Sequence, residues 1–353
     1  MRNLGVTVLL ALIAAALAGC GGGAGESGEV GASGEAGAKP AAQRLPAALP
    51  PQAQDREIWV AMDGWDDAEA LAFPMAQAKD YFSKYQLDVL TLSPVTPKLA
   101  IPDVVIGQDD FAVAHGPEAV LAKDRGAPIA IVGSFVPQPT AALIWPQGAG
   151  VTAIADLKGK TIAIPGLSFQ RDLLATVLAS GGLTLDEVKV KSVGNKIVPA
   201  LLHGRTDAIF GGSANVEGAQ LRDQGIEPVI KPVGDLGIPA YEELVLVARD
   251  DWAAENPQSV DHLLKALARG ATTAIASPKA AIEVLEEDGE ANPEVSSSAR
   301  EAEVGQTLPL LSKDLVPSPS RTQQLIDWMY EQKMIGSAFP AAEILTGPGD
   351  EGS

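Results

Sequence analysis

The segment "DFAVAHGPEAVLAKDRGAPIAIVG", residues 110–133, determines the fold class of this chain. Its first six residues are mostly apolar and predict a buried strand, and the stretch from Pro117 to Gly126 predicts a helix. A second apolar run, from Pro128 to Val136, predicts another strand. The order strand, helix, strand is typical of a largely parallel sheet with helices packed on its faces.

Further strands alternate with helices on both sides of this segment. They are predicted at residues 56–63, 87–93, 141–146, 161–166, 187–193, 207–212, 227–233 and 243–249. The C-terminal part is predicted to be helical from 256 to 277 and from 320 to 335. This pattern favours an α/β fold with two open, mainly parallel sheets, and the mainly helical end indicates two lobes.

The composition argues against a nucleic-acid-binding protein. The net charge is −19 and the isoelectric point is near 4.5, whereas nucleic-acid binding requires a basic face. Three scattered histidines and a single cysteine provide no metal-ligand spacing. About 295 residues follow residue 56, which is enough for a large core or two domains.

The N-terminus has the layout of a secretory signal, because residues 4–19 form an uncharged apolar run after Arg2. The run is short for a membrane-spanning helix. It ends in "LAGC", residues 17–20, which resembles the cleavage box of bacterial lipoproteins, in which the cysteine is acylated and becomes the mature N-terminus. We therefore expect lipid on Cys20, and an uncleaved anchor helix is the alternative. Residues 21–55 are rich in Gly, Ala, Ser, Glu and Pro and predict a flexible tether.

Polar, small and aromatic residues follow most of the predicted strands. Ligands of open α/β sheets bind beyond the carboxyl ends of the strands, so these residues are expected to share one cleft. They are Asp63, Gly64, Trp65, His115, Gly116, Ser134, Gln138, Gly166, Ser168, Phe169, Gln170, Gly211, Gly212, Ser213, Asn215 and Glu217, with Tyr241 and Glu243 before the strand at 243–249.

An ordered series of blocks resembles the solute-binding proteins of ABC importers for thiamine-pyrimidine precursors, sulfonates, nitrate and riboflavin. The series covers almost all of residues 57–337. The blocks are "AKDYFSKYQLDV", "DFAVAHGPEAVLAKDRGAPIAIVG", "IADLKGKTIAIPG", "VGNKIVPALLHGRTDAIFGGSANVEGAQL", "IPAYEELVLVARDDWAAENPQSVDHLLKALARG" and "QQLIDWMYEQKMI".

The resemblance implies a two-lobed periplasmic-binding-protein fold of type II, in which two crossover strands join the lobes and a hinge closes them on the ligand. The crossings are expected near residues 142–145 and 241–247. The implied organisation is a signal peptide at 1–19, a lipid-anchored tether at 20–55, one lobe from 56–144 plus 245–353, and the other lobe at 145–244.

The resemblance also implies a role. The chain is expected to be the extracytoplasmic solute-binding component of an ABC importer: a monomer without a cofactor or metal that binds a small molecule and delivers it to a permease. Its location would be the periplasm or the outer face of the cytoplasmic membrane, anchored by lipid on Cys20. No P-loop sequence occurs, so the energy for transport must come from the permease's ATPase.

Within the family, the pyrimidine-precursor binders are most similar. Their strand-end Asn and Glu match Asn215 and Glu217, and their "Y-x-E-L-V" strand matches Tyr241 and Glu243. Their first loop carries Asp-Trp, matched by "MDGWDD" at 62–67 with a glycine inserted, and their usual Asn and His in that loop are replaced here by Asp67 and Ala70.

The residue types favour a flat nitrogen heterocycle over an anion. Asp63, Asp66, Glu217 and Glu243 would accept hydrogen bonds from amino or ring N–H groups, whereas sulfonate or nitrate needs N–H donors. Aromatic side chains are expected to stack on the ring. The predicted ligand-binding residues are Asp63, Trp65, His115, Gln138, Ser168, Phe169, Ser213, Asn215, Glu217, Tyr241 and Glu243.

Several alternatives remain open at the level of sequence. The ligand could instead be riboflavin, a sulfonate or nitrate. A more remote alternative is an enzyme similar to the family's thiamine-pyrimidine synthase, which carries a cysteine-rich iron-binding segment. His115 could cap the helix that begins at Pro117, Trp65 could pack at a lobe edge, and Glu217 and Glu243 could be solvated charges. Trp252, Trp328, His203 and His262 are expected to have structural or surface roles.

Overall fold

The computed structural model describes residues 57–62, 67–93, 97–287 and 295–346, and these belong to one compact unit. Within these ranges no helix has both the length and the apolar character needed to cross a membrane. The predicted signal peptide, Cys20 and the tether lie outside the described residues, so they stay predictions.

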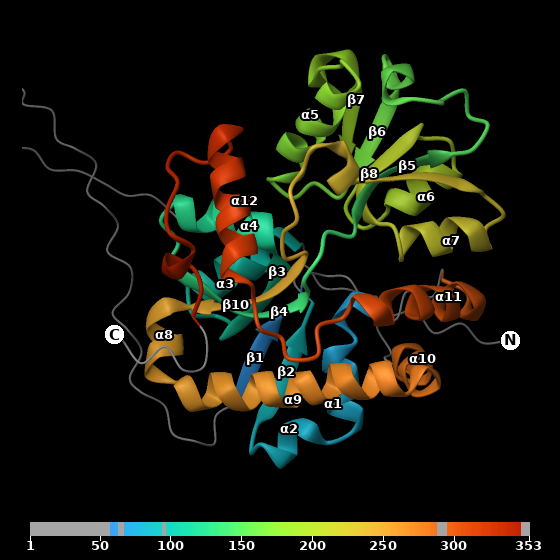
Figure 1. Ribbon diagram of the computed structural model, residues 1–353. Coiled ribbons are helices and arrows are strands. Elements are labelled where there is room, and N and C mark those ends of the chain that lie inside the picture. Colours follow the sequence, from blue (N-terminus) through green and yellow to red (C-terminus); the bar gives the residue numbers. More distant parts are fainter. Residues whose placement is uncertain (1–56, 63–66, 94–96, 288–294, 347–353) are drawn as a thin grey trace, which may run out of the picture. The chain divides into compact units, whose positions relative to one another are not determined.

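Ten strands form two five-stranded sheets in the described part of the chain (Figure 1). The first sheet has the order β2-β1-β3-β10-β4 and the second has the order β7-β6-β8-β5-β9. The strands are β1 (Glu57–Ala61), β2 (Asp88–Leu92), β3 (Phe111–His115), β4 (Ile129–Val136), β5 (Ala141–Pro146), β6 (Thr161–Ile164), β7 (Lys189–Ser192), β8 (Ala208–Ser213), β9 (Pro228–Pro232) and β10 (Leu244–Arg249).

Four strands of each sheet run in one direction and one strand opposes them. β1 pairs in parallel with β2 and β3, whereas β10 pairs antiparallel with β3 and β4. In the second sheet β6 pairs in parallel with β7 and β8, and β5 pairs antiparallel with β8 and β9. The opposed strand is in each case the first one that the chain enters after crossing from the other sheet. Its N-terminal end therefore lies beside the carboxyl ends of its neighbours.

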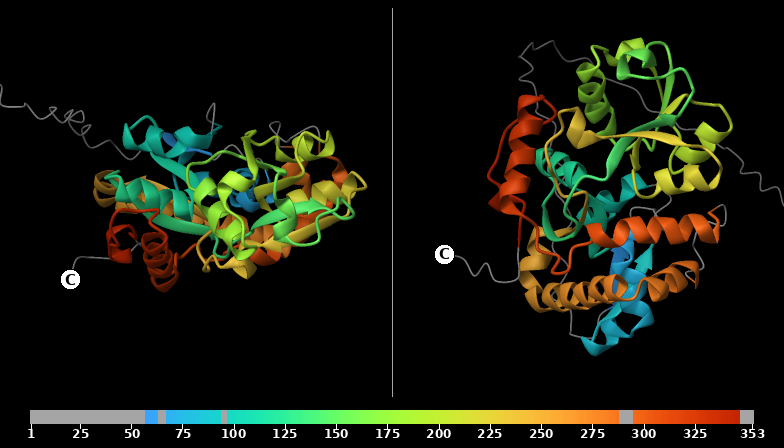
Figure 2. Two further views of the ribbon diagram at one scale, coloured as in Figure 1. Left: turned by 90° about the horizontal axis from the view of Figure 1, so that it is seen from above. Right: turned by 45° about the vertical axis from the view of Figure 1, so that its right-hand side comes forward.

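Helices cover the sheets and form most of the C-terminal part (Figures 1 and 2). The α-helices are α1 (Ala72–Ala78), α2 (Tyr81–Lys84), α3 (Ala100–Val105), α4 (Gly116–Asp124), α5 (Gln170–Ser180), α6 (Ile197–Leu202), α7 (Glu217–Asp223), α8 (Asp250–Glu255), α9 (Pro257–Ala276), α10 (Pro278–Glu287), α11 (Ser297–Thr307) and α12 (Pro319–Glu331). The 3₁₀ turns are η1 (Ala68–Ala70), η2 (Pro97–Leu99), η3 (Ile154–Leu157), η4 (Leu185–Glu187), η5 (Val233–Leu236), η6 (Leu308–Leu310) and η7 (Ala341–Glu343).

Two connections join the sheets. The chain leaves the first sheet at Val136 and enters the second at Ala141, and it returns between Pro232 and Leu244. The crossing that the sequence predicts near 142–145 falls inside β5, because those apolar residues are buried in the second sheet. Since the described residues form one compact unit, the exact division into lobes stays a prediction.

The outer edge of β4 is covered by the C-terminal part of the chain. The backbone N–H of Ser134 donates to the carbonyl of Leu315 (2.9 Å), and the N–H of Ser312 donates to the carbonyl of Phe135 (2.8 Å). Farther along the strand, Ile131 forms a parallel bridge with Leu345. This part of the sheet edge is therefore paired, which protects it from association with another strand.

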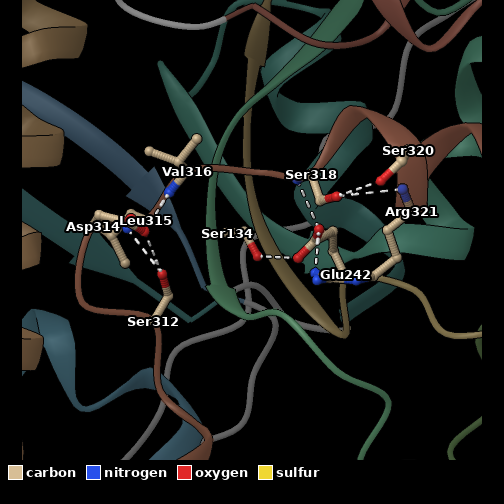
Figure 3. Close-up of polar contacts among 9 residues, drawn as sticks. All are labelled: Ser134, Glu242, Ser312, Asp314, Leu315, Val316, Ser318, Ser320 and Arg321. Atoms are coloured by element: carbon tan, nitrogen blue, oxygen red, sulfur yellow. Dashed lines mark hydrogen bonds and ion pairs between the residues drawn. The ribbon is translucent and has the colours of Figure 1, made fainter.

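Glu242 fastens the same C-terminal segment to the return connection (Figure 3). Its buried carboxylate accepts hydrogen bonds from the Ser134 hydroxyl (2.5 Å), the Ser318 N–H (2.9 Å) and the Arg321 guanidinium (2.7 Å). Arg321 lies in the first turn of α12, which packs on α4 (Figures 1 and 2). Leu244, the first residue of β10, thus lies two positions after Glu242, which anchors the C-terminal helix α12.

Residues predicted to be structural have structural contacts. The Trp252 ring packs edge-on against Phe111 with 5.1 Å between ring centroids, and Trp328 packs against the core. The Nδ1 atom of His262 lies 2.9 Å from the carbonyl oxygen of Tyr85. These side chains support packing between helices and sheet, away from the strand ends considered next.

Candidate functional site

The strand ends of both sheets contribute to one cluster of polar side chains. His115 ends β3 and pairs with Leu244, the first residue of β10, while Ser213 ends β8 and pairs with Ala141, the first residue of β5. Because β5 and β10 run opposite to their neighbours, the residues just before these two strands lie beside the carboxyl ends of β8 and β3. Thr140 and Glu243 therefore join the strand-end residues, as the two hydrogen-bond networks below show.

The first network is centred on the buried carboxylate of Glu243. Its Oε2 atom accepts hydrogen bonds from the N–H groups of Thr140 (2.8 Å) and Ala141 (3.1 Å) and from the Tyr241 hydroxyl (3.2 Å). Its Oε1 atom lies 3.0 Å from Nδ1 of His115. Because Thr140 and Glu243 lie in the two connections between the sheets, this carboxylate ties both connections together.

These contacts keep Glu243 ionised. Burial alone would raise the pKa of Glu243, but the hydrogen bond and charge of His115, together with the Thr140 and Ala141 amides, lower this pKa overall. Burial and the neighbouring Glu243 raise the pKa of Tyr241, so its hydroxyl remains a donor. Glu243 therefore orients His115 and holds the ring with Nδ1 toward the carboxylate.

His115 does not cap the helix that follows it. It occupies the N-cap position of α4 but makes no side-chain capping bond. Its ring instead packs against Phe169, with 5.6 Å between centroids and planes tilted by 50°. Its backbone N–H donates a hydrogen bond to Glu118, whose pKa is raised to about 7 by burial, an effect that His115 only partly offsets.

The second network lies at the end of β8. The Ser213 N–H donates to Oε2 of Glu217 (2.5 Å), and the Ser213 and Thr140 hydroxyls are 3.0 Å apart. Burial is the main cause that raises the pKa of Glu217 to about 8, and the nearby Glu69 and Glu303 contribute to this rise. A Cβ atom at Gly212 would lie 2.9 Å from Cδ of Glu217, so glycine leaves the space for this carboxyl group.

Side chains from the two sheets meet directly through Asn215 and Glu69. The Asn215 Nδ2 atom donates to Oε1 of Glu69 (3.1 Å) and to the Thr307 hydroxyl (2.7 Å). Glu303, four residues before Thr307 on α11, accepts a hydrogen bond from the Ala68 N–H (2.8 Å). α11 therefore lies against both η1 and α7.

A small pocket lies between these networks. Its lining residues are Asp67, Glu69, Ala70, His115, Gly211, Gly212, Ser213, Glu217 and Leu244. Its volume of about 20 Å³ has room for about one water molecule. Among the described residues, the lining contains three carboxyl groups and one imidazole, and no lysine or arginine.

The structure brings together many of the predicted site residues, and it leaves others apart. His115, Phe169, Ser213, Asn215, Glu217, Tyr241 and Glu243 belong to the connected networks, although Tyr241 is fully buried and its hydroxyl is bound to Glu243. Gln138 and Ser168 are exposed and do not line the pocket. Asp63, Trp65 and Asp66 lie outside the described residues. A ligand contact for each of these residues stays a prediction.

Sequence reasoning missed Glu69, Glu303 and Thr140. Glu69 lies eight residues after the end of β1, within the acidic stretch "WDDAEA". Its place in the loop that follows a strand end was a signal that could have marked it as a candidate site residue. Glu303 lies far along the sequence from the first strand and reaches Ala68 in η1 only because α11 packs against η1. In the described ranges, no three His, Cys, Asp or Glu side chains are arranged to hold a metal ion.

Comparisons with known proteins identify the fold and the relatives. Residues 68–281 match the family model described as "NMT1/THI5 like". The alkanesulfonate-binding protein SsuA from Xanthomonas axonopodis pv. citri, bound to MOPS, superposes with a TM-score of 0.66 at 18% identity, covering 85% of this chain and 100% of that one. The two-lobed binding-protein fold expected from the resemblance is thereby confirmed.

The curated relatives include a Haemophilus influenzae protein described as a thiamine biosynthesis protein, 29% identical over 85% of this chain and 94% of that protein. The formylaminopyrimidine-binding protein of Halalkalibacterium halodurans is 27% identical over 65% of this chain and 69% of its own length. The riboflavin-binding protein RibY of Chloroflexus aurantiacus is 26% identical, covering 69% and 70%. Pyrimidine phosphate synthases also match, including one of Candida albicans at 28% identity over 59% of this chain and 64% of that protein.

Proposed function

Because this chain belongs to the NMT1/THI5-like family and has the fold of a solute-binding protein, we propose that it is the extracytoplasmic binding component of an ABC importer. We propose further that it captures a flat nitrogen heterocycle, such as a pyrimidine precursor of thiamine, and delivers it to a permease. The proposal follows the formylaminopyrimidine-binding relative in ligand class.

The observation that carries the ligand class is the acceptor-rich lining of the pocket. Asp67, Glu69 and Glu217 supply carboxyl oxygens, and His115 is the one basic side chain among the described lining residues. Amino and ring N–H groups donate to such oxygens. A sulfonate or nitrate would need N–H donors or an arginine at these positions, and bringing it beside carboxylates would cost electrostatic energy.

We assign different roles to the two glutamates that the sequence analysis grouped together. Glu217 lines the pocket and would meet the ligand. Glu243 does not line the pocket, and its oxygens already accept four hydrogen bonds or contacts from protein groups. Glu243 therefore acts as a positioning residue for His115, and Phe169 supports the other side of the imidazole.

Binding requires the two sheets to separate. A pocket of about 20 Å³ cannot admit a pyrimidine, so the contact between Asn215 and Glu69 must open before the ligand enters. The connections at 137–140 and 233–243 are the places where backbone rotation would separate the sheets. Ligand stacking by Trp65, and by Tyr241 in an opened form, belongs to this proposal.

Riboflavin is the second candidate, because a riboflavin-binding relative matches. It is also flat and carries ring N–H groups, but it is larger and would need wider opening. A synthase activity has less support from the residues. The chain holds one cysteine, Cys20, rather than the cysteine-rich segment that the resemblance attributes to the family's synthase.

The location and partners follow from the same proposal. Lipid on Cys20 would anchor the protein outside the cytoplasm, and the tether at 21–55 would leave the folded part free to reach a permease. We propose that the protein acts as a monomer. It would supply specificity, while the permease's ATPase would supply energy.

Native mass spectrometry of the protein purified without added ligand tests this proposal. The expected result is a bound mass that, after release, is identified as an aminopyrimidine or another flat nitrogen heterocycle. A protein that retains only an alkanesulfonate or nitrate would contradict the ligand class while leaving the fold and importer role intact.

A further inference from the structure

Three buried carboxyl groups interact electrostatically where η1 and α11 lie against the residues that follow β8. Glu69 lies in η1 after β1, and Glu303 lies in α11. Glu217 begins α7 in the part of the chain that forms the second sheet, which is called the second-sheet half below. Each of these residues is at most 5% exposed. Glu69 is bound to Asn215 from the second-sheet half, and Glu303 is bound to the Ala68 N–H beside Glu69. The cluster is thus assembled from segments that a hinge motion would separate.

The charged neighbours of this cluster are mostly other carboxyl groups. Glu69 faces Glu243 and Glu217, and Glu217 faces Glu69 and Glu303. Glu303 faces Glu69 and also Arg300, the cation in this set. On the adjoining side, Glu243 faces His115 and Tyr241, and His115 faces Glu118. Asp67 completes the acidic lining of the pocket.

Hydrogen-bond donors reach each carboxyl group of this cluster, but one acceptor beside it has no partner in the described part of the protein. The Asn215 side chain gives its Nδ2 donor to Glu69 and Thr307, while its Oδ1 atom is buried and has no hydrogen-bond partner in the described part of the protein. A buried acceptor without a partner costs free energy. Among the described residues, the contact therefore leaves the Asn215 Oδ1 acceptor without an N–H or O–H donor.

Burial has a common effect on the three glutamates. It raises the pKa of Glu217 to about 8 and that of Glu303 to about 7. It also raises the pKa of Glu69, and repulsion from Glu243 adds to this rise. When the sheets separate and water reaches these groups, their pKa values should return toward that of a hydrated glutamate, about 4.3.

We propose that contact between the two halves is coupled to proton uptake by the Glu69–Glu217–Glu303 cluster, so that closure without ligand is opposed at neutral and alkaline pH. The inference rests on the hinge motion of the proposed function. A ligand with N–H donors satisfies the oxygens of Glu69 and Glu217, which line the pocket, and removes the need for protons on these two groups. The cluster thereby links closure to the presence of a donor-rich ligand.

The direction of the pH dependence follows from these pKa values. A carboxyl group whose pKa is higher in the closed form favours closure fully when the pH is below its open-form pKa of about 4.3. This contribution is lost as the pH rises through the pKa that the group has in the closed form. With pKa values of about 7 for Glu303 and about 8 for Glu217 in the closed form, the pH range over which closure becomes less favourable ends near pH 7 to 8. Within it, each proton taken up changes the ratio of closed to open protein by up to about tenfold per pH unit.

The distance between two spin labels, measured by pulsed electron–electron double resonance, tests the coupling. The full chain would carry Cys20→Ala, with Asp186→Cys and Lys279→Cys on exposed positions in the two halves. In ligand-free protein the distance should be short at pH 5 and long at pH 9. Glu217→Gln and Glu303→Gln should each make the change with pH smaller, whereas Glu301→Gln, an exposed position on the same α11 helix, should leave it unchanged. Circular dichroism at both pH values checks that each variant is folded.

An added aminopyrimidine separates failure of this inference from failure of the hinge. The probe is 4-amino-5-hydroxymethyl-2-methylpyrimidine, added at pH 8. If the probe shortens the distance but pH alone does not change it, the proton coupling is overturned and the hinge stands. If neither pH nor the probe changes the distance, both the coupling and the hinge of the proposed function are overturned.

Discussion

Glu242 and Glu243 are adjacent in the sequence, and their buried carboxylates face different parts of the protein. Glu242 binds Ser134, Ser318 and Arg321 and fastens the C-terminal segment. Glu243 binds the Thr140 backbone and His115 at the edge of the pocket. The return connection thus joins the edge of the pocket to the C-terminal helix α12 through two adjacent residues.

Replacing Glu243 with alanine should destabilise the fold. The change leaves the buried Tyr241 hydroxyl and the Thr140 and Ala141 N–H groups without their acceptor, at about 1–3 kcal/mol for each buried group. We expect the free energy of unfolding to fall by at least about 3 kcal/mol in urea denaturation. Glu331→Ala, at an exposed position of α12, is the control and should leave it unchanged. An unchanged stability of Glu243→Ala would refute this account of the network.

Glu243 should also contribute to the acid sensitivity of the protein. Its pKa is lowered in the folded state, so its contribution to stability is present above about pH 4.3 and is lost as pH falls through the lower folded value. Glu243→Gln should therefore lose less stability than the wild type between pH 5 and pH 3 in thermal unfolding scans. The same loss in both proteins would show that the Glu243 charge does not stabilise the fold.

Glu242→Ala should release the C-terminal segment from β4. The Arg321 charge lies near the surface and can rehydrate, so we expect the loss to be at the lower end for a broken buried pair, about 3 kcal/mol. Hydrogen exchange should increase at residues 312–321 before it increases elsewhere. Arg222→Ala is the control, because it removes an exposed ion pair to Glu227 that should contribute under about 1 kcal/mol. Uniform exchange across the chain in Glu242→Ala would count against a local anchor.

Two glycines offer a matched pair of substitutions. A Cβ atom at Gly116 would lie 2.3 Å from the Glu242 carbonyl oxygen, so Gly116→Ala should cost about 1–3 kcal/mol. Gly305 lies inside α11 with no neighbouring atom within 4 Å of its added Cβ, so Gly305→Ala should stabilise the protein by about 0.5–1 kcal/mol. Thermal unfolding of both variants checks the opposite signs. A stabilised Gly116→Ala protein would show that the return connection can move away from α4.

The strand–helix pattern was sufficient to predict the two sheets, whereas a ligand cleft at the carboxyl ends of their strands stays a prediction. Alternating apolar strands and helices define those edges whatever the tertiary detail. The exact crossing could not be found in this way, because the buried residues of β5 have the same apolar character as a crossover strand. Glu303 could not be found either, since nothing local in "SSAREAEVGQT" shows that α11 packs against η1 and α7.

Cys20→Ala tests the predicted lipid anchor, which lies outside the described residues. The variant should move from the membrane fraction to the soluble fraction on cell fractionation, because one missing acyl anchor removes the membrane attachment. Cys20→Ser should behave in the same way and serves as a second substitution of the same thiol. Retention of both variants on membranes would favour an uncleaved anchor helix at residues 4–19 instead.

Isothermal titration of an aminopyrimidine and an alkanesulfonate tests the central claim most directly, with wild type, Glu69→Ala and Glu217→Ala as the protein samples. The account predicts that the wild type binds the aminopyrimidine and not the sulfonate. Each truncation should weaken aminopyrimidine binding about tenfold to hundredfold, because loss of a charge-assisted acceptor costs about 1.5–3 kcal/mol. Tight binding of the sulfonate by the wild type, with stronger binding after Glu217→Ala, would contradict the account and assign the protein to the anion carriers.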